Sequence, residues 1–247
     1  MGACILSGHS KWSSIKRKKE KIDNQRGKVF TKISKAISIA VRLGGPDPNL
    51  NSRLRECILK AKAFNLPNEN IEKIIKKIRD DGSELNCESF FYEGYGPGGV
   101  AFIVEILTNN KNRAAANFRM YFSKAGGNLG PPGCVSFMFD EKSVIEIAKN
   151  GVNEEVIIHD AIEAGAEDLK IEKNLFVVIS EKNKHESVKQ FLLNIGYEFV
   201  LSEISRIPNI FKPIYDKETK LRIQDFIETI ENDDDVQTVW CNCKFEN

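Results

Sequence analysis

The hydrophobic periodicity of the chain changes near residue 87, and this change limits the folds that are open to it. Before residue 87 the apolar residues recur every three or four positions, which is typical of amphipathic helices. After it, short alternating runs and helical runs follow one another, which is typical of sheets covered by helices. The 247-residue chain is therefore expected to hold a helical domain followed by mixed helix-and-sheet domains.

Residues 1–86 are expected to form three helices behind a basic lead-in. Between Lys28 and Leu43 the apolar residues follow helical spacing, and Gly44-Gly45 is expected to end this helix. A second helix is expected to begin with Asn51 or Ser52 as its N-cap. A third is predicted by the stripe of Ile71, Ile74, Ile75 and Ile78, and it ends at Asp80-Asp81-Gly82.

The remaining chain predicts two β-α-β-β-α-β units. Residues 142–204 show this order once, with helices stopped at Gly165 and Gly196. The strand, helix and strand at 99–139, joined to a strand, helix and strand after residue 205, spell it again. Here Thr108-Asn109 is expected to cap a helix, and 135–139 to form a strand.

The expected fold class is therefore α+β, with an N-terminal three-helix domain and two ferredoxin-like domains, one inserted in the other. The expected boundaries are 1–86 for the helical domain, 87–140 with 205–247 for the outer ferredoxin-like domain, and 141–204 for the inserted one.

Charge divides the chain at the same place. Residues 1–45 hold 11 Lys and Arg against 2 Asp and Glu, although the whole chain has a formal charge of only +1. Residues 1–86 carry 19 basic and 9 acidic side chains, and residues 87–247 carry 17 and 26. A basic module on an acidic body indicates contact with a polyanion such as nucleic acid. A solvated helix face, or association between the two halves, explains the same charges without nucleic acid.

The candidate nucleic-acid contacts come from this basic block. In the lead-in they are Lys16, Arg17, Lys18, Lys19 and Lys21, and on the first helix, opposite its apolar stripe, they are Lys28, Lys32, Lys35 and Arg42. Trp12 lies among them, where it either stacks on a base or anchors the bundle. Lys111, Arg113 and Arg119, on the helix expected after residue 109, form a possible second contact.

Other kinds of site find little support in the sequence. The three His residues are isolated, and the six Cys residues show no paired zinc-ligand spacing, so neither a catalytic centre nor a metal or cofactor site is expected. The glycine clusters 95–99 and 126–133 lack a phosphate-loop signature and are interpreted as turns, or as a recognition surface. No run of about 18 apolar residues suggests a membrane helix, and the start does not resemble a secretory signal.

Several stretches, taken together, resemble the YebC/PmpR family. They are GHSKWSSIKRKK, RGKVFTKI, LGGPDPNLNSRLR, KAKAFNLPNENIEKIIKK, YEGYGPGGVAFIVEILTNNKNR and FSKAGGNLG, and the resemblance is dense over residues 8–139. EAGAEDL and the closing DDVQTVW are also similar. Pro131-Pro132 departs from the family pattern. The resemblance implies the three-domain arrangement above and adds four candidate contacts, Lys11, Arg26, Arg53 and Arg55.

The resemblance also implies a cytoplasmic, non-enzymatic regulator of gene expression, of a family commonly assigned as DNA-binding transcriptional regulators. Mitochondrial relatives are similar to translational activators of cytochrome oxidase synthesis, and bacterial ones are linked to the ribosome and to synthesis through proline-rich stretches. Two nucleic-acid partners therefore compete, DNA and ribosomal or messenger RNA. A protein-interaction scaffold is the third hypothesis, and the oligomeric state stays open.

Overall fold

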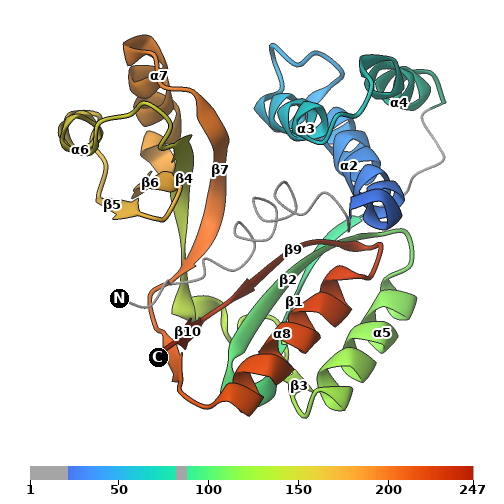
Figure 1. The fold of residues 1–247 in the computed structure, drawn as a ribbon. Coiled ribbons are helices and arrows are strands. Elements are labelled where there is room, and N and C mark those ends of the chain that lie inside the picture. Colours follow the sequence, from blue (N-terminus) through green and yellow to red (C-terminus); the bar gives the residue numbers. More distant parts are fainter. Residues whose placement is uncertain (1–21, 82–87, 247) are drawn as a thin grey trace. The chain divides into compact units, whose positions relative to one another are not determined.

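The computed structural model describes residues 22–81 and 88–246 (Figure 1). Contacts divide this part of the chain into two compact units. One unit spans residues 139–209, and the other comprises the described residues before 139 and after 209. Each unit is treated by itself below.

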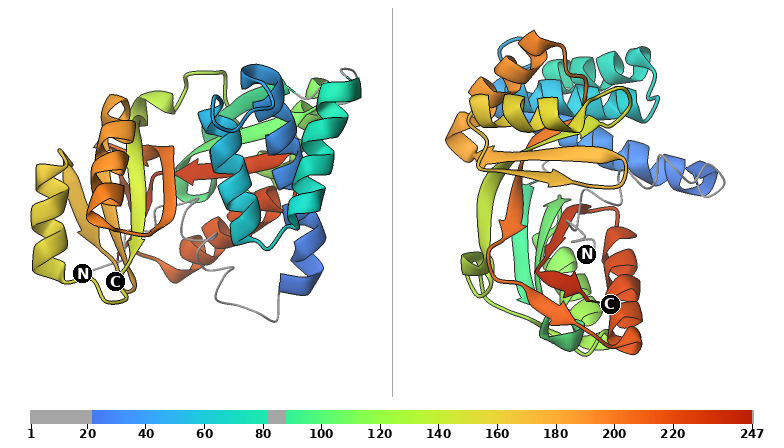
Figure 2. Two further views of the ribbon diagram at one scale, coloured as in Figure 1. Left: turned by 90° about the horizontal axis from the view of Figure 1, so that it is seen from above. Right: turned by 60° about the vertical axis from the view of Figure 1, so that its left-hand side comes forward.

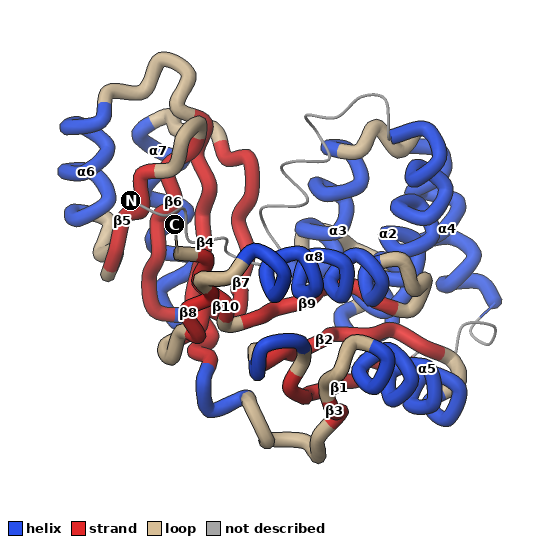
Figure 3. Tube along the Cα trace, turned by 60° about the horizontal axis from the view of Figure 1, so that its bottom comes forward, coloured by secondary structure: helices blue, strands red, loops and turns tan. Residues whose placement is uncertain are grey.

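Three helices open the larger unit, namely α2 (Ile22–Gly44), α3 (Ser52–Ala63) and α4 (Asn68–Asp81). Helix α2 packs against both of the others, as Figure 3 shows. Their shared core holds Ile37 and Leu54 with no exposed surface and Ile71 with 3%. The apolar stripes seen in the sequence therefore face one another, and the three-helix prediction is confirmed for these residues.

Asn51 fixes the turn between α2 and α3. Its side chain accepts a hydrogen bond from the Leu54 amide at 3.0 Å, as the N-cap of α3, and donates to the Ala40 and Gly45 carbonyls at 2.7 and 2.8 Å. Gly45 follows α2 with a φ of 84°, a left-handed conformation that glycine adopts without strain. One buried amide thus satisfies unpaired groups at the ends of two helices.

The α/β part of the same unit is built on one antiparallel sheet. Its elements before the insertion are β1 (Glu88–Tyr95), β2 (Ala101–Thr108), α5 (Lys111–Lys124) and β3 (Asn128–Leu129). Those after it are β8 (Lys212–Ile214), α8 (Lys217–Glu231), β9 (Val236–Cys241) and β10 (Cys243–Phe245). The strand order is β3-β1-β2-β9, and α5 and α8 lie side by side on one face (Figure 1).

Aromatic side chains fill the space between this sheet and its two helices. Phe102 of β2, Phe122 of α5 and Phe226 of α8 meet edge to face, with ring centroids 4.9 to 6.3 Å apart. Edge-to-face pairs of this kind stabilise a core by about 0.5–1.5 kcal/mol beyond the area they bury. The triad therefore ties strand and helices together around the centre of the α/β core.

The position between β3 and β2 in the outer sheet is not filled by the strand that the sequence pattern predicted. The sequence pattern predicted that the strand near Lys212 would fill it, but β8 instead pairs in parallel with β10 in a separate two-stranded sheet. The position between β3 and β2 is taken by β1, which precedes β2 in the chain. The order of the strands in space is that of a ferredoxin-like sheet, while the order along the chain is not.

The smaller unit has the predicted topology. Its elements are β4 (Phe139–Ala148), α6 (Glu154–Glu163), β5 (Asp168–Ile171), β6 (Leu175–Glu181), α7 (His185–Ile195) and β7 (Phe199–Pro208). The antiparallel order β5-β6-β4-β7 is ferredoxin-like, and α6 and α7 bury its core (Figure 2, yellow to orange). The α+β fold class is confirmed, as is the β-α-β-β-α-β order of the inserted domain.

Two local predictions in the outer domain were wrong. Residues 135–139 do not form a strand, because a 3-10 turn occupies Ser136–Met138 and β4 begins only at Phe139. The N-cap of α5 is Asn110, which accepts from the Arg113 amide at 3.0 Å. The Thr108 hydroxyl instead accepts from the Asn110 amide at 3.1 Å and donates to Asp235 at 2.9 Å.

Candidate nucleic-acid interface

The predicted contacts of the lead-in fall outside the described residues. They are Lys11, Lys16, Arg17, Lys18, Lys19 and Lys21. Arg26 and Lys28 belong to α2, but their side chains also lie outside the description. The structure therefore bears on the remaining candidates of the helical domain, Lys32, Lys35, Arg42, Arg53 and Arg55, and on the second set on α5.

The spacing of Lys32 and Lys35 placed them correctly opposite the apolar stripe of α2, but that face is not open to solvent at these two residues. Lys32 is only 8% exposed, and its ammonium group donates to the Glu231 carbonyl at 2.7 Å. Lys35 donates to the Asp234 carbonyl at 3.0 Å and to the Asp235 carboxylate at 2.7 Å. The face of α2 opposite its apolar stripe is thus covered by the corner between α8 and β9. The carbonyl end of α8 carries partial negative charge, which suits these two cations.

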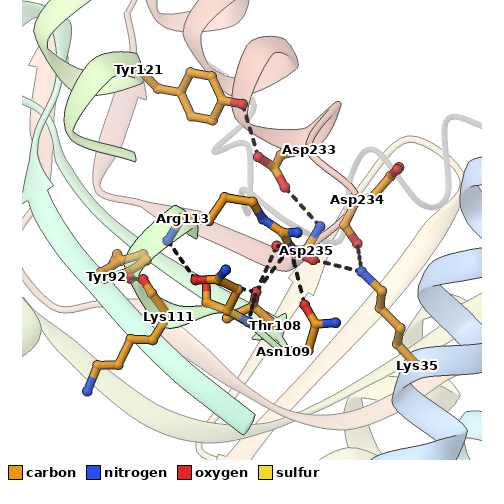
Figure 4. Close-up of polar contacts among 11 residues, drawn as sticks. Lys35, Tyr92, Thr108, Asn109, Lys111, Arg113, Tyr121, Asp233, Asp234 and Asp235 are labelled. Atoms are coloured by element: carbon orange, nitrogen blue, oxygen red, sulfur yellow. Dashed lines mark hydrogen bonds and ion pairs between the residues drawn. The ribbon is translucent and has the colours of Figure 1, made fainter. Parts of the chain in front are cut away.

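Asp235 is the centre of a polar cluster that joins three elements (Figure 4). One carboxylate oxygen accepts from Lys35 of α2, and the other accepts from Arg113 of α5 at 2.8 Å and from Thr108 of β2 at 2.9 Å. The Asp235 side chain is 8% exposed. Burial by itself raises its pKa, but the hydrogen bonds from Lys35, Arg113 and Thr108 outweigh burial and hold the pKa below its ordinary value.

Asp233 stabilises this cluster through two hydrogen bonds. Its carboxylate accepts from the Asp235 backbone amide at 2.9 Å and from the Tyr121 hydroxyl at 3.0 Å. Burial, with the hydrogen bond to Asp233, raises the pKa of Tyr121 to about 12, so the phenol stays protonated. The turn from α8 into β9 is therefore fixed to α5 at two points.

A polar cavity of about 540 Å³ lies beside Asp235. It is lined by Lys35 and Arg113, by Asn109, Asn117 and Asn232, and by Asp233, Asp234 and Asp235. The cavity brings a helical-domain candidate and a second-contact candidate together, although 78 positions separate Lys35 from Arg113 in the sequence.

The other predicted cations keep their charge at the surface. Arg42 and Arg55 are exposed, and Arg53 is 48% exposed with a Glu105 carboxylate 3.5 Å away. Lys111 is exposed, with its ammonium group 4.6 Å from the Phe90 ring centroid, and Arg119 is exposed on α5. Exposed ion pairs contribute about 0–1 kcal/mol, so Arg53 can exchange Glu105 for a phosphate at little cost.

Sequence reasoning missed further cations on α3 and α4. The exposed ones are Lys60, Lys62, Lys73, Lys76, Lys77 and Arg79. Helix α3 holds four basic residues and one acidic residue, so the signal was present in its composition. Helix α4 holds four basic and four acidic residues, so the excess of positive charge beyond α2 lies on α3.

The two glycine clusters, predicted as separate turns, lie against each other. A side chain at Gly127 would collide with the Tyr95 carbonyl oxygen and with Gly96. Gly98 has a φ of 68°, so the first cluster needs glycine for its turn. The second loop is held by Glu93, whose buried carboxylate accepts from the amides of Gly133, Val135 and Ser136 at 2.9 to 3.0 Å.

Comparison with known proteins decides the family. The model of the TACO1/YebC second and third domains matches residues 87–243, and the model of the TACO1/YebC N-terminal domain matches residues 10–81. A protein of Clostridium botulinum is 46% identical over 241 residues, covering 97% of this chain and 98% of that protein. The chain belongs to the TACO1/YebC family.

Relatives and a solved structure agree with this assignment. The Clostridium botulinum protein and one of Acetivibrio thermocellus are both named probable transcriptional regulatory protein. The latter is 47% identical over 238 residues, or 96% of this chain and 98% of that protein. The crystal structure of a conserved hypothetical protein from Aquifex aeolicus is 40% identical, with a TM-score of 0.85, and the match covers 93% of this chain and 95% of that one.

Three reactive groups in the described part of this TACO1/YebC member are buried in the fold. His185 is buried, with Nδ1 2.8 Å from the Ser143 hydroxyl, which has no exposed surface. Cys241 and Cys243 are buried thiols that form no disulfide, and their Sγ atoms lie 3.3 Å apart. Among the described residues, one group of three possible metal ligands lies close together, formed by His159, Asp160 and Glu163 of α6. Within the same described part, no helix is long and apolar enough to cross a membrane.

Proposed function

We propose that the protein is a non-enzymatic, cytoplasmic regulator of gene expression that binds nucleic acid through its helical domain. The observation that carries this proposal is the distribution of cations. Lys32 and Lys35 are used inside the fold, yet Arg42, Arg53 and Arg55 still present charge to solvent. Phosphate contacts of this kind fix a protein on nucleic acid without reading its sequence.

The names of the relatives support a regulatory role and favour DNA as the partner. Those relatives match nearly the whole length of this chain and are named probable transcriptional regulatory proteins. The family resemblance also offers RNA, on the ribosome or in a messenger, as the target. The nucleic acid that the protein retains in cells distinguishes these two forms of the proposal.

The scaffold hypothesis started from the opposite charges of the two halves of the chain. Part of that complementarity is satisfied within one chain, because Lys32 and Lys35 of the basic domain contact the corner between α8 and β9. We therefore assign the exposed cations to a polyanion, and keep the scaffold as an outcome of the experiment below.

The experiment is recovery of bound nucleic acid from a cell lysate. Three proteins are compared: the wild type, a variant with Arg42, Arg53 and Arg55 changed to Glu, and a control with Lys184, Lys212 and Lys217 changed to Glu. The control residues are also exposed, and its formal charge changes by the same amount. A parallel variant with Lys16, Arg17, Lys18 and Lys19 changed to Glu tests the lead-in.

We expect the wild type and the control to retain the same nucleic acid, and both basic-block variants to lose most of it. Promoter DNA in the recovered material indicates a transcriptional role, and ribosomal or messenger RNA a translational one. Equal recovery by all four proteins, or recovery of proteins alone, would overturn nucleic-acid binding by the helical domain and favour the scaffold.

A further inference from the structure

The cavity beside Asp235 has the size and chemistry of a site for one nucleotide unit. Its volume of about 540 Å³ lies within the range of about 300–1,000 Å³ that small-molecule sites occupy. Its lining combines two cations with Asn109, Asn117 and Asn232 and with three aspartates, Asp233, Asp234 and Asp235. Cations bind phosphate, whereas carboxamides both donate and accept hydrogen bonds, which suits a sugar or a base edge.

The Asp235 carboxylate lies where a phosphate group would meet these cations. Its Oδ1 is 2.7 Å from the Lys35 ammonium nitrogen, and its Oδ2 is 2.8 Å from an Arg113 guanidinium nitrogen. A phosphodiester also offers two anionic oxygens on one central atom, and Arg and Lys are the side chains that proteins use to hold it. The carboxylate therefore resembles, in charge and reach, the ligand that the pair would bind.

The cavity is also lined by one cation from each of the two predicted contact sets. Lys35 comes from the basic helix α2, and Arg113 comes from α5, which carries Lys111 and Arg119 as well. A phosphate group bound in the cavity would therefore contact one cation from each of the two predicted sets. In the unbound protein both are already neutralised by one carboxylate.

We propose that this cavity receives one nucleotide of the bound nucleic acid, whose phosphate displaces the Asp235 carboxylate from Lys35 and Arg113. This inference rests on the proposed function. It adds one phosphate contact and names the carboxylate that competes with that phosphate. Asp235 acts as an internal substitute for phosphate, which keeps the two cations paired in the free protein and lowers its affinity for nucleic acid.

The neighbouring carboxylates of Asp233 and Asp234 differ from that of Asp235 in their contacts, so one of them can serve as a control. Asp233 is engaged by Tyr121 and by the Asp235 amide, so it does not compete for the cations. Asp234 is exposed, and its backbone carbonyl, not its carboxylate, accepts from Lys35. Asp234→Asn and Asp235→Asn therefore remove the same charge from adjacent positions, but only Asp235→Asn releases the cations.

The experiment measures the affinity of each variant for a fluorescein-labelled duplex DNA and a single-stranded RNA, both short and of mixed sequence. We expect Asp235→Asn to bind about tenfold more tightly than Asp234→Asn, the effect of about one charge-assisted contact. In a background with Lys35 and Arg113 changed to Gln, the two Asn variants should bind equally, because the released cations are absent.

Equal affinity of Asp235→Asn and Asp234→Asn, with wild-type binding intact, would overturn this site and leave the proposed function standing. Failure of the wild type to bind either probe would instead overturn the proposed function itself. Thermal unfolding of each variant identifies a folding defect.

A second measurement needs no substitution. Duplex DNA that carries an abasic aldehyde is cross-linked to wild-type lysines by borohydride reduction, and the modified peptides are identified by mass spectrometry. We expect an adduct on Lys35, and none on Lys32, whose ammonium group is buried against Glu231. Adducts confined to other lysines would contradict the proposal even if Asp235→Asn fails to fold.

Discussion

Glu93 makes the stability of the second glycine loop depend on a single carboxylate. The side chain is 7% exposed. One oxygen accepts from the Gly133 amide at 2.9 Å, and the other accepts from the amides of Val135 and Ser136 at 3.0 and 2.9 Å. Glu93→Gln keeps the shape but replaces one acceptor oxygen by an NH₂ group, which cannot accept.

The expected cost follows from this geometry. If the Gln oxygen faces Val135 and Ser136, the Gly133 amide alone loses its acceptor, and the other two bonds lose the negative charge that strengthens them. We therefore expect Glu93→Gln to lower the free energy of unfolding by about 1–3 kcal/mol, and to lower the urea midpoint by about 1 M. Hydrogen exchange should accelerate at Gly133, Val135 and Ser136.

Glu105→Gln is the matched control on the neighbouring strand. The Glu105 side chain is 18% exposed and lies 3.5 Å from Arg53, so its loss should change stability by only about 0–1 kcal/mol. If Glu93→Gln and Glu105→Gln unfold at the same urea concentration as the wild type, with unchanged exchange at the three amides, the assignment of Glu93 as the loop's anchor is wrong.

Two further substitutions test the domains separately. Ile37→Ala removes a fully buried side chain between the three helices and should cost about 2–5 kcal/mol, and an unchanged melting temperature would refute the helical core. In the inserted domain, burial lowers the pKa of His185, as does the charge of Lys189, against the opposing effects of Glu186 and Glu203. The unfolded chain therefore binds the proton more readily, so stability falls as pH drops below about 6.5. We expect His185→Gln to lose less melting temperature than the wild type between about pH 7 and pH 5. The same loss in both proteins would contradict this explanation.

Local pattern was enough to predict most of the elements. The isoleucine stripe of α4 and the alternation in residues 142–204 depend only on neighbours in sequence, and both elements formed as expected. The place of β1 in the outer sheet was missed, although β1 pairs with β2 along its whole length and with β3, a strand of two residues, only at its end. The short turn of Gly and Pro between β1 and β2 is the local signal that could have placed these two strands side by side.

The candidate site shows the same limit in its side chains. The spacing of Lys32 and Lys35 placed them correctly opposite the apolar stripe of α2, but no feature of that helix reveals that a second surface covers them. That surface is supplied about 200 positions later in the chain, by Glu231 and Asp235. Nothing in the stretch Asp233-Asp234-Asp235 itself reveals these partners, and only the fold makes Asp235 a central acceptor.

The salt dependence of nucleic-acid affinity tests the central claim most directly. Each phosphate contact with duplex DNA contributes about −0.9 to the slope of log K against log salt, so six or more contacts predict a slope of about −5 or steeper. Changing Arg42, Arg53 and Arg55 to Gln should make that slope shallower by about 2–3, whereas changing Lys184, Lys212 and Lys217 to Gln should leave it unchanged. An affinity that barely changes between about 50 and 200 mM salt, or equal slopes in both variants, would contradict binding through the helical domain.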